Sequence, residues 1–452
     1  MKNESKEVLI MGNGFDLACK LKTSYEDFFY DKYYLKMIYQ KYSKDHKISQ
    51  KQAVETVKGS FIKLFNDALT NKLRLDDFTE FNSKSNGWAR NLFKQQFVQL
   101  FKDYDIKDMQ PQTPTNWDVI FISAMILMDN RLPKKWCDIE KIIFEVITTV
   151  LTNDNSAFSK EYFSEDESRS YFIKLVNYVF KESRKSLATS MLDNLQQFEV
   201  SFGNYIQEQI KYYGKAYIEN AAKLLCKITG SSDKNHVMLD VINFNYSLDE
   251  NIIDLLLKEG SLPNIKINSW TNIHGIAFWN DKKRKKFITE THGESLTNKL
   301  SAPIFGIDGH DILSSEGNEL NLDDPRIIFT KSFRLIDNNV NVMRDKTHNF
   351  QEKVDKIIFY GHSLGRADYS YFESLFDMYE IYNGNTELNF YYHTSEKKLD
   401  NRVSERKVLK KIVNLLTSYG KTLSDQHGEN IVNKLVLEQQ LNLLPSPNIT
   451  VD

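Results

Sequence analysis

The chain is poor in cysteine, proline and glycine for its length of 452 residues. Its three cysteines are far apart and form no C-x-x-C pair, which disfavours both a cysteine zinc site and a disulfide framework. Eighteen glycines and eight prolines are few for this length, so helices are favoured over an all-β fold that needs many tight turns. A chain of this length is expected to hold about two or three structural units.

The sequence also lacks a strong charge of one sign and a long apolar run. Its formal net charge is −2, so no global basic field draws it to nucleic acid or to a membrane surface. The longest apolar stretch, residues 119–128, is too short to span a bilayer, and the first residues lack the apolar region of a signal peptide. With 41% hydrophobic and 27% charged residues, the composition is that of a globular protein, which we expect to be cytoplasmic.

Apolar strands that alternate with helices predict an α/β fold. One strand is expected at residues 8–11, and further strands at 237–244, 265–274, 302–307, 326–330, 356–361 and 388–393. Helices are expected at 251–258, 340–353 and 369–382, and one long helix or two in series at 186–228. This pattern indicates a doubly wound, mostly parallel, Rossmann-like sheet that is covered on both faces.

The domain organisation predicted from this pattern is discontinuous. Residues 1–40 and 236–404 form the Rossmann-like nucleotide-binding domain. Residues 41–235 show apolar residues at helical spacing and form a large all-helical insertion after the first strand–helix unit. Residues 405–452 form a helical tail that packs back on the domain.

The most informative motif is a glycine turn directly after the first strand, formed by Gly12, Asn13, Gly14, Phe15 and Asp16. Because glycine lacks a Cβ, the backbone N–H groups of such a turn can close on a phosphate. A capping-box pattern from Thr23 to Glu26 then opens a helix. The third glycine of the G-x-G-x-x-G dinucleotide fingerprint is replaced by Leu17, so a turn that only connects two elements is the alternative.

Polar residues also follow the other predicted strands. Asn245 follows residues 237–244, His274 ends 265–274, and the sequence GHSLGRAD, residues 361–368, follows the strand that begins at 356. Asp308 and His310 follow residues 302–307. In a parallel sheet, ligands bind beyond the carboxyl ends of the strands, so we expect these residues to share one pocket.

Each of these residues also has a structural interpretation. Asn245 could cap the next helix, and His274 could be a strand-end histidine that bonds to a carbonyl. Asp308 and His310 lie beside a glycine, as turn-forming residues do. A second histidine–glycine pair at residues 292–293 competes with His274 for the functional role. The acids of WCDIE, Asp138 and Glu140, fit either a solvated helix start or a lid that reaches over the pocket.

The motifs together resemble a known family. In order along the chain they are VLIMGNGFDLACKLKTSYEDFF, WCDIE, FNYS, NIHG, IFGID and IIFYGHSLGRADYSYFESLF. They are similar to the AbiH family of bacterial phage abortive-infection proteins, from the first strand to about residue 380. The resemblance implies a role in antiviral defence, a phage-derived trigger and, through the helical insertion, contact with a partner or a second copy of the chain.

More remotely, the motif series is similar to sirtuin-like domains that hydrolyse NAD. This resemblance implies that Gly12, Gly14 and Asp16 line the phosphates, that Asn245 orients a water or the ribose, and that His274 is the base. The second glycine turn is then expected to approach the nucleotide through Gly361, His362, Ser363 and Asp368. NAD or a related nucleotide is the expected substrate or ligand, and no metal is expected. The cysteine zinc module of true sirtuins is absent and Ser247 stands where an aspartate is usual, which disfavours deacylation.

Two other functions remain open from the sequence. GHSLG fits the G-x-S-x-G nucleophile elbow of α/β-hydrolases, with Ser363 as nucleophile, His393 or His427 as base and Asp368 or Asp377 as acid. Alternatively, the domain binds a nucleotide as a sensor without hydrolysing it. A nuclease is disfavoured, because the basic run at 281–286 is typical of an exposed loop and no close cluster of metal-binding acids accompanies it.

Overall fold

The computed structural model describes residues 3–73, 87–107, 109–128, 136–156, 158, 162–163, 165–180, 186–232, 235–280, 282, 285–286, 289–290, 303–312, 323–338, 349–394, 398–423 and 428–449. Of the basic run at 281–286, only 282 and 285–286 lie among these residues, and the pair His292–Gly293 and His427 lie outside them.

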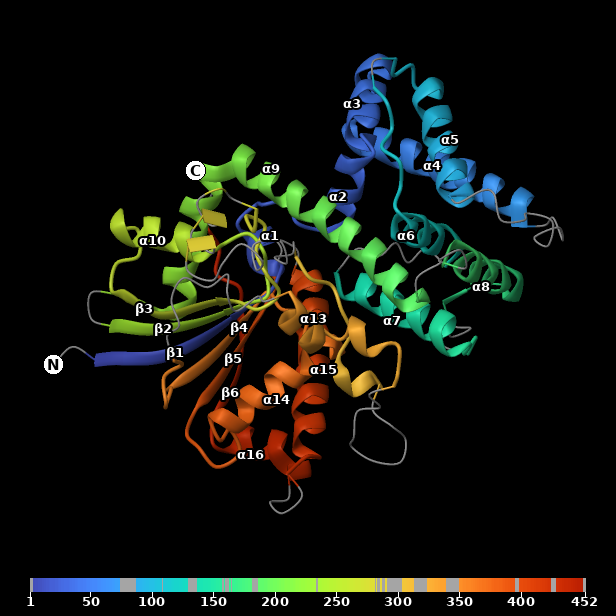
Figure 1. Cartoon of the computed structure of the whole chain (residues 1–452). Helices are drawn as coiled ribbons and strands as arrows, with labels where there is room; N and C mark the ends of the chain where they lie inside the picture. Colours follow the sequence, from blue (N-terminus) through green and yellow to red (C-terminus); the bar gives the residue numbers. More distant parts are fainter. Residues whose placement is uncertain are drawn as a thin grey trace.

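The protein contains a six-stranded, all-parallel sheet (Figure 1). The strand order is β3-β2-β1-β4-β5-β6. The strands are β1 (Asn3–Met11), β2 (Asn235–Asn243), β3 (Ile265–Asn272), β4 (Lys356–Tyr360), β5 (Glu387–Tyr392) and β6 (Leu441–Pro445). This confirms the predicted α/β class and a parallel sheet, with the first strand in its middle.

Helices make up most of the rest of the described chain (Figure 1). Before β2 they are α1 (Gly14–Ala18), α2 (Tyr25–Lys32), α3 (Leu35–His46), α4 (Gln50–Leu73), α5 (Trp88–Asp103), α6 (Asn116–Leu127), α7 (Trp136–Thr152), α8 (Asp166–Phe180) and α9 (Leu187–Thr229). After β2 they are α10 (Glu250–Lys258), α13 (Lys331–Asp337), α14 (Tyr369–Met378), α15 (Lys398–Gly420) and α16 (Ile431–Leu437). The long segment at 186–228 therefore forms one helix, α9, and the helices predicted at 251–258 and 369–382 are confirmed.

Both faces of the sheet are buried, which explains why the second half of β1 and most of β4 are apolar. Side chains alternate between the faces of a strand. In β1, Val8 and Ile10 pack with residues of α14, α15 and α16, such as Phe376. Leu9 and Met11 point to the other face and belong to a larger core that continues through α2–α10. Figure 1 shows α14–α16 on one side of the sheet, while α9 links the other side to the group α2–α8.

Two predicted strands, at 302–307 and 326–330, are wrong. The described part of this region has a single parallel bridge between Ile307 and Thr330, and residues Ile327–Phe329 form a 3₁₀ helix. Thr330 then caps α13, because its side chain accepts from the Phe333 N–H. Ile304, Phe305 and Ile307 are buried although they form no strand, which gives the same apolar sequence pattern as a buried strand.

The tail also departs from the prediction of an all-helical segment. It contains α15 and α16, but it ends in β6, which pairs with β5 through Leu388 and Leu441. A strand of five residues at the edge of a sheet carries too short a pattern to distinguish it from the end of a helix. In the helix predicted at 340–353, residues 340–348 lie outside the described part and 349–353 are not helical.

Candidate functional site

The register of the sheet places the loops after β1, β2, β3 and β4 next to one another. Met11 at the end of β1 lies opposite Asn243 in β2 and Tyr360 in β4. Asn243 in turn lies opposite Asn272, the last residue of β3. These strands therefore end level, and the polar residues that follow them emerge at one edge.

The two glycine turns at this edge pack backbone against backbone. The Gly12 N–H donates to the Tyr360 carbonyl at 3.0 Å, and the Gly14 N–H donates to the Gly361 carbonyl at 2.8 Å. A Cβ on Gly12 would lie 2.4 Å from the His362 Cα, and one on Gly14 would lie 2.6 Å from the Gly361 Cα. In this closed arrangement the N–H groups that were predicted to hold phosphate already donate to carbonyls of the protein.

Gly361 provides a direct test of this close approach. Its φ is +68°, and a Cβ would lie 2.4 Å from the Phe15 nitrogen. We expect Gly361→Ala to lower the free energy of unfolding by about 2–5 kcal/mol, from the left-handed backbone and the clash together. Gly214→Ala is the matched control, because nothing lies within 4 Å of its Cβ position in α9 and alanine should stabilise the helix by about 0.5–1 kcal/mol. Urea unfolding measures both, and equal stabilities for the two variants would contradict the packing.

The rest of the GNGFD motif is tied into the interior. Phe15 is fully buried, and the Asn13 Oδ1 accepts from the Thr23 hydroxyl at 2.6 Å. The Asp16 carboxylate is also buried and accepts from the hydroxyls of Tyr217 and Ser247, each at 2.6 Å. Burial raises the pKa of Asp16 to about 6, although both hydrogen bonds oppose the shift. Asp16 thus holds the first loop to α9 and to the loop after β2.

Asn245 holds the first two loops together. Its amide nitrogen donates to the Gly12 carbonyl at 2.9 Å, and its backbone N–H donates to the Asn243 Oδ1 at 2.9 Å. Asn272 at the end of β3 donates to the Asn245 carbonyl at 2.9 Å. The helix-capping role that was the alternative for Asn245 belongs to Asp249, whose side chain accepts from the Ile252 N–H. Asn245 is therefore placed at the sheet edge, beside the glycine turn.

A buried cluster of charged groups and imidazoles lies at the same edge, and we call its members the edge cluster: Glu140, His274, Lys331, His362 and Asp368. Asp368 is at its centre. Its Oδ2 lies 3.2 Å from the His362 Nε2, and its Oδ1 lies 3.7 Å from the His274 Nε2. The Lys331 Nζ lies 2.5 Å from the Asp368 Oδ1 and 2.7 Å from the Glu140 Oε1.

Burial and mutual charge set the protonation of the edge cluster. Burial alone would raise the pKa of Asp368, but Lys331 and His362 outweigh it and hold that pKa well below its usual range. Burial alone would lower the pKa of Lys331, but the carboxylates of Asp368 and Glu140 raise it above its ordinary value. Burial raises the pKa of Glu140 to about 7, although Lys331 opposes the shift. The closest pair in the cluster is thus an ammonium and a carboxylate at neutral pH.

His274 is a neutral imidazole in this setting. It is 3% exposed, and burial and then Lys331 lower its pKa to about 3. Its Nε2 has no hydrogen-bond partner among the described residues. The rings of Phe244 and Tyr371 lie edge-on to it, at centroid distances of 5.3 and 5.6 Å. A buried imidazole nitrogen without a partner marks a place where a substrate or water has a hydrogen bond to make.

A family model described as bacteriophage abortive infection AbiH matches residues 8–392. The chain belongs to the AbiH family. The match runs from β1 to Tyr392, the last residue of β5, and it spans the helices between β1 and β2 and the whole edge cluster. Searches of curated proteins and of solved structures found no significant match. Membership confirms the resemblance found in the sequence and places the chain among proteins of antiviral defence by abortive infection.

Two members of the edge cluster in this AbiH chain were not predicted as site residues. Lys331 begins α13 and carries no sequence signal, since its neighbours form no recognisable motif. The sequence allows Glu140 as part of a lid, and the structure brings it from α7 to the Lys331 ammonium. Asp138, the other acid of WCDIE, has a side chain that lies outside the described residues. The signal that could have found Lys331 is the need of a buried Asp368 for a cation.

The residues of the serine-hydrolase interpretation are not brought together in the described structure. The Ser363 hydroxyl accepts from the Gly365 N–H at 3.3 Å, and the Ser363 carbonyl accepts from Lys411. Asp377 accepts from the Tyr419 hydroxyl at 2.9 Å, and His393 is exposed.

Asp308 and His310 form a separate group at this end of the molecule. The buried Asp308 carboxylate accepts from the Ser370 hydroxyl at 2.7 Å and faces the His310 Nδ1 at 2.8 Å. It also accepts from the backbone N–H groups of Ser370 and His310. These contacts agree with the turn-forming interpretation, and they fix the start of α14, just after Asp368.

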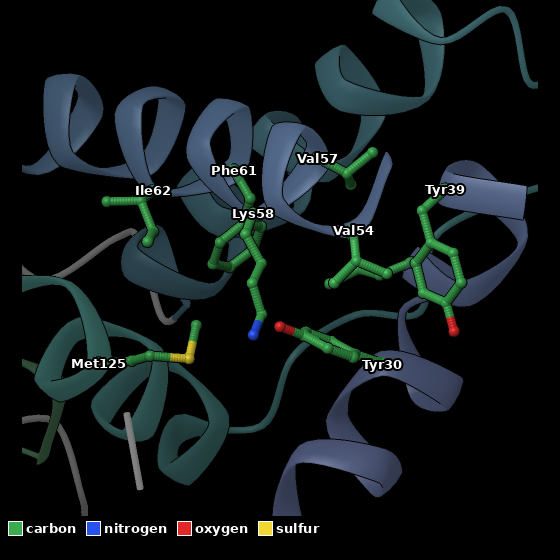
Figure 2. Close-up of a pocket in the computed structure, with 9 residues that line it drawn as sticks. Tyr30, Tyr39, Val54, Val57, Lys58, Phe61, Ile62 and Met125 are labelled. Atoms are coloured by element: carbon green, nitrogen blue, oxygen red, sulfur yellow. The ribbon is translucent and has the colours of Figure 1, made fainter. Parts of the chain in front are cut away.

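Two hollows lie elsewhere in the AbiH chain. One is a small apolar cavity of about 10 Å³ among α2, α3, α4 and α6, where Lys58 points toward Tyr30 (Figure 2). Another, of about 420 Å³, lies between the ends of α7 and α9 and the segment at Pro325. Neither has a wall residue in the edge cluster. The edge cluster is closed in this conformation, and its side chains are 11% exposed or less.

The described residues contain no group of histidine, cysteine and acidic side chains with the arrangement of a metal site. No helix within the described ranges is both long and apolar enough to cross a membrane.

The buried His274 should make stability depend on pH. In the unfolded chain its pKa is about 6.5 and in the folded protein about 3, so between these values the unfolded state binds the extra proton. Its contribution is therefore fully present above pH 6.5 and is lost as the pH falls. From pH 7 to pH 5 the loss is about 2 kcal/mol.

We expect His274→Gln to remove this loss. The difference in unfolding free energy between wild type and variant, measured in urea at pH 7 and pH 5, isolates it from other titrating groups. His46→Gln, at an exposed position on α3, should keep the wild-type pH dependence. An unchanged difference at the two pH values would show that His274 is not buried as a neutral group.

Proposed function

We propose that this AbiH-family chain hydrolyses NAD or a related nucleotide at the edge cluster during the response to phage. The observation that carries the proposal is the convergence of Asn245, His274 and the second glycine turn at the carboxyl ends of adjacent parallel strands. The strand order 3-2-1-4-5-6 is that of Rossmann-like dinucleotide-binding sheets, in which the ligand lies where the order reverses. Here that point lies between β1 and β4, the two strands that carry the glycine turns.

The chemistry uses the groups at this edge. Breaking the bond between nicotinamide and ribose develops positive charge on the ribose, and a nearby carboxylate such as Asp368 stabilises it. The oxygen of a water bonds to the ribose carbon, the electron pair of the broken bond goes to the nicotinamide ring, and the proton of the water goes to His274. The ring leaves neutral, and ADP-ribose is the other product. A neutral imidazole can accept this proton, whereas a protonated one cannot.

Asn245 has a positioning role in this proposal. Its amide nitrogen is held by the Gly12 carbonyl, so the direction of the amide oxygen is set. An amide oxygen can accept from a water or a ribose hydroxyl without competing for the proton that His274 takes. The similarity to sirtuin-like domains, in which an asparagine and a histidine share this task, remains part of the proposal.

The test uses the full chain without and with lysate from phage-infected cells. Incubation with NAD, followed by chromatography of free nicotinamide, measures hydrolysis. Thermal shifts with NAD, NADP, ADP-ribose and ATP measure binding. A ligand at 100 times its Kd should stabilise the fold by about 2.7 kcal/mol. We expect nicotinamide release and a shift with NAD. Folded protein that shows neither result, with or without lysate, would rule out the proposed function.

A further inference from the structure

Lys331 is a buried cation inside the edge cluster. Its side chain is 3% exposed, and its ammonium lies between the Asp368 and Glu140 carboxylates. A lysine is seldom buried to this degree unless it is paired, so the two carboxylates determine its position. Asp368 belongs to the loop after β4, whereas Glu140 belongs to α7, one of the helices between β1 and β2.

The helix that carries Lys331 is anchored a second time, one turn further on. The fully buried Arg334 guanidinium makes two hydrogen bonds of 2.7 Å to the Glu199 carboxylate of α9 and donates to the Phe305 carbonyl at 2.8 Å. The first turn of α13 is therefore held by α7 through Glu140 and by α9 through Glu199. The position of Lys331 at Asp368 depends on both of these helices (Figure 1).

We propose that Lys331 is an internal inhibitor of the edge cluster, which neutralises Asp368 and closes the site until α7, through Glu140, draws the ammonium away from Asp368. The inference rests on the proposed function and adds the regulation of the same site. In the closed state, the carboxylate that would stabilise positive charge on a ribose is already paired with an ammonium at 2.5 Å. The same ammonium lowers the pKa of His274, so the proposed base is also weakened. Movement of the ammonium away from Asp368 together with α7 and Glu140 would reverse both effects.

The test is a charge-matched double variant, Lys331→Met with Glu140→Gln. It removes one cation and one acid, so the net charge of the buried cluster changes little, and Asp368 keeps His362 as its remaining partner. Lys331→Arg keeps the cation and serves as the conservative variant. Lys211→Met, at an exposed lysine paired with Glu208 on α9, is the surface control. Thermal melting of each protein confirms that it is folded before activity is measured.

We expect the double variant to release nicotinamide at least ~10-fold faster than wild type without phage lysate, because both the base and the carboxylate become available. Lys211→Met should remain at the wild-type rate, and Lys331→Arg, which keeps the cation, should not exceed it. The acid limb of the pH–rate profile should move to higher pH in the double variant, because His274 then faces an unneutralised Asp368. A structural role for Lys331 would not move this limb. NAD should also bind the double variant more tightly than wild type.

The results of this experiment distinguish the inhibitory role of Lys331 from the proposed NAD hydrolysis. A folded double variant that binds NAD no more tightly and turns it over no faster than an active wild type would overturn the inhibitor and leave the function standing. Tighter NAD binding by the double variant without nicotinamide release from any protein would support the inhibitor and overturn hydrolysis. A double variant slower than wild type would make Lys331 part of the catalytic machinery and would also overturn the inhibitor.

Discussion

Replacing His274 with glutamine should reduce nicotinamide release by about 10²–10⁴-fold, the usual contribution of a positioned general base. Glutamine is close to histidine in size and can make a hydrogen bond, but it cannot take a proton. The variant should therefore still bind NAD, and the loss should fall on kcat more than on KM. The rate is best compared under conditions in which the wild-type chain is active, with phage lysate or in the Lys331→Met, Glu140→Gln background.

The control for this experiment is His46→Gln, which removes an exposed imidazole on α3 and should leave the rate unchanged. Asn245→Ala provides a second comparison. It should lower the rate and also cost about 1 kcal/mol of stability, because its amide no longer holds the Gly12 carbonyl. Full activity in a folded His274→Gln protein would remove His274 as the base. Full defence against phage in both variants, with nucleotide still bound, would favour the sensor over the enzyme.

The second large effect concerns stability. Glu199→Gln should lower the free energy of unfolding by about 3–5 kcal/mol, because it leaves the Arg334 guanidinium buried without a counter-charge. Both side chains are fully buried, and the carboxylate also accepts from the Phe305 N–H at 2.8 Å. The variant should unfold at a lower urea concentration with an unchanged m-value, which reports stability alone.

An exposed ion pair is the matched control for this measurement. Glu208 and Lys211 form an i,i+3 pair on α9, and both side chains are more than half exposed. Glu208→Gln should therefore change stability by less than about 0.5 kcal/mol. If Glu199→Gln were equally mild, the Arg334 region would have to be open to water. The double variant Glu199→Met, Arg334→Met should recover most of the loss, because an apolar replacement of a buried pair is often neutral.

Local sequence signals predicted most elements of the fold but not all. Apolar runs identified β1, β2 and β4, because strands buried on both faces carry little polar alternation, and apolar-rich segments identified β3 and β5. The same signal produced a false strand at 302–307, since buried coil is apolar for the same reason. The edge strand β6 was missed because its five residues sit next to a helix and pair with β5 only through the fold.

The candidate site was also predicted only in part from the sequence. The rule that ligands lie beyond the ends of parallel strands placed Gly12, Asn245, His274 and Asp368 at one edge, and the register of the sheet confirms that their loops are adjacent. The sequence did not predict that the glycines of the first turn pack against another backbone. A glycine turn that cradles a phosphate and one that packs on another backbone have the same sequence, and only the position of the Gly361 turn distinguishes them.

The sequence by itself determined most strands of the core, the helical character of 186–228, the AbiH-family motifs and the residues that follow each strand. These depend on periodicity and on short-range steric preferences, which a few neighbouring residues suffice to express. Only the tertiary structure decided that Lys331 and Glu140 meet Asp368, that Arg334 pairs with Glu199, and that His274 is buried as a neutral group. Burial and charge pairing arise between segments far apart in the chain, and no local pattern encodes which segments those are.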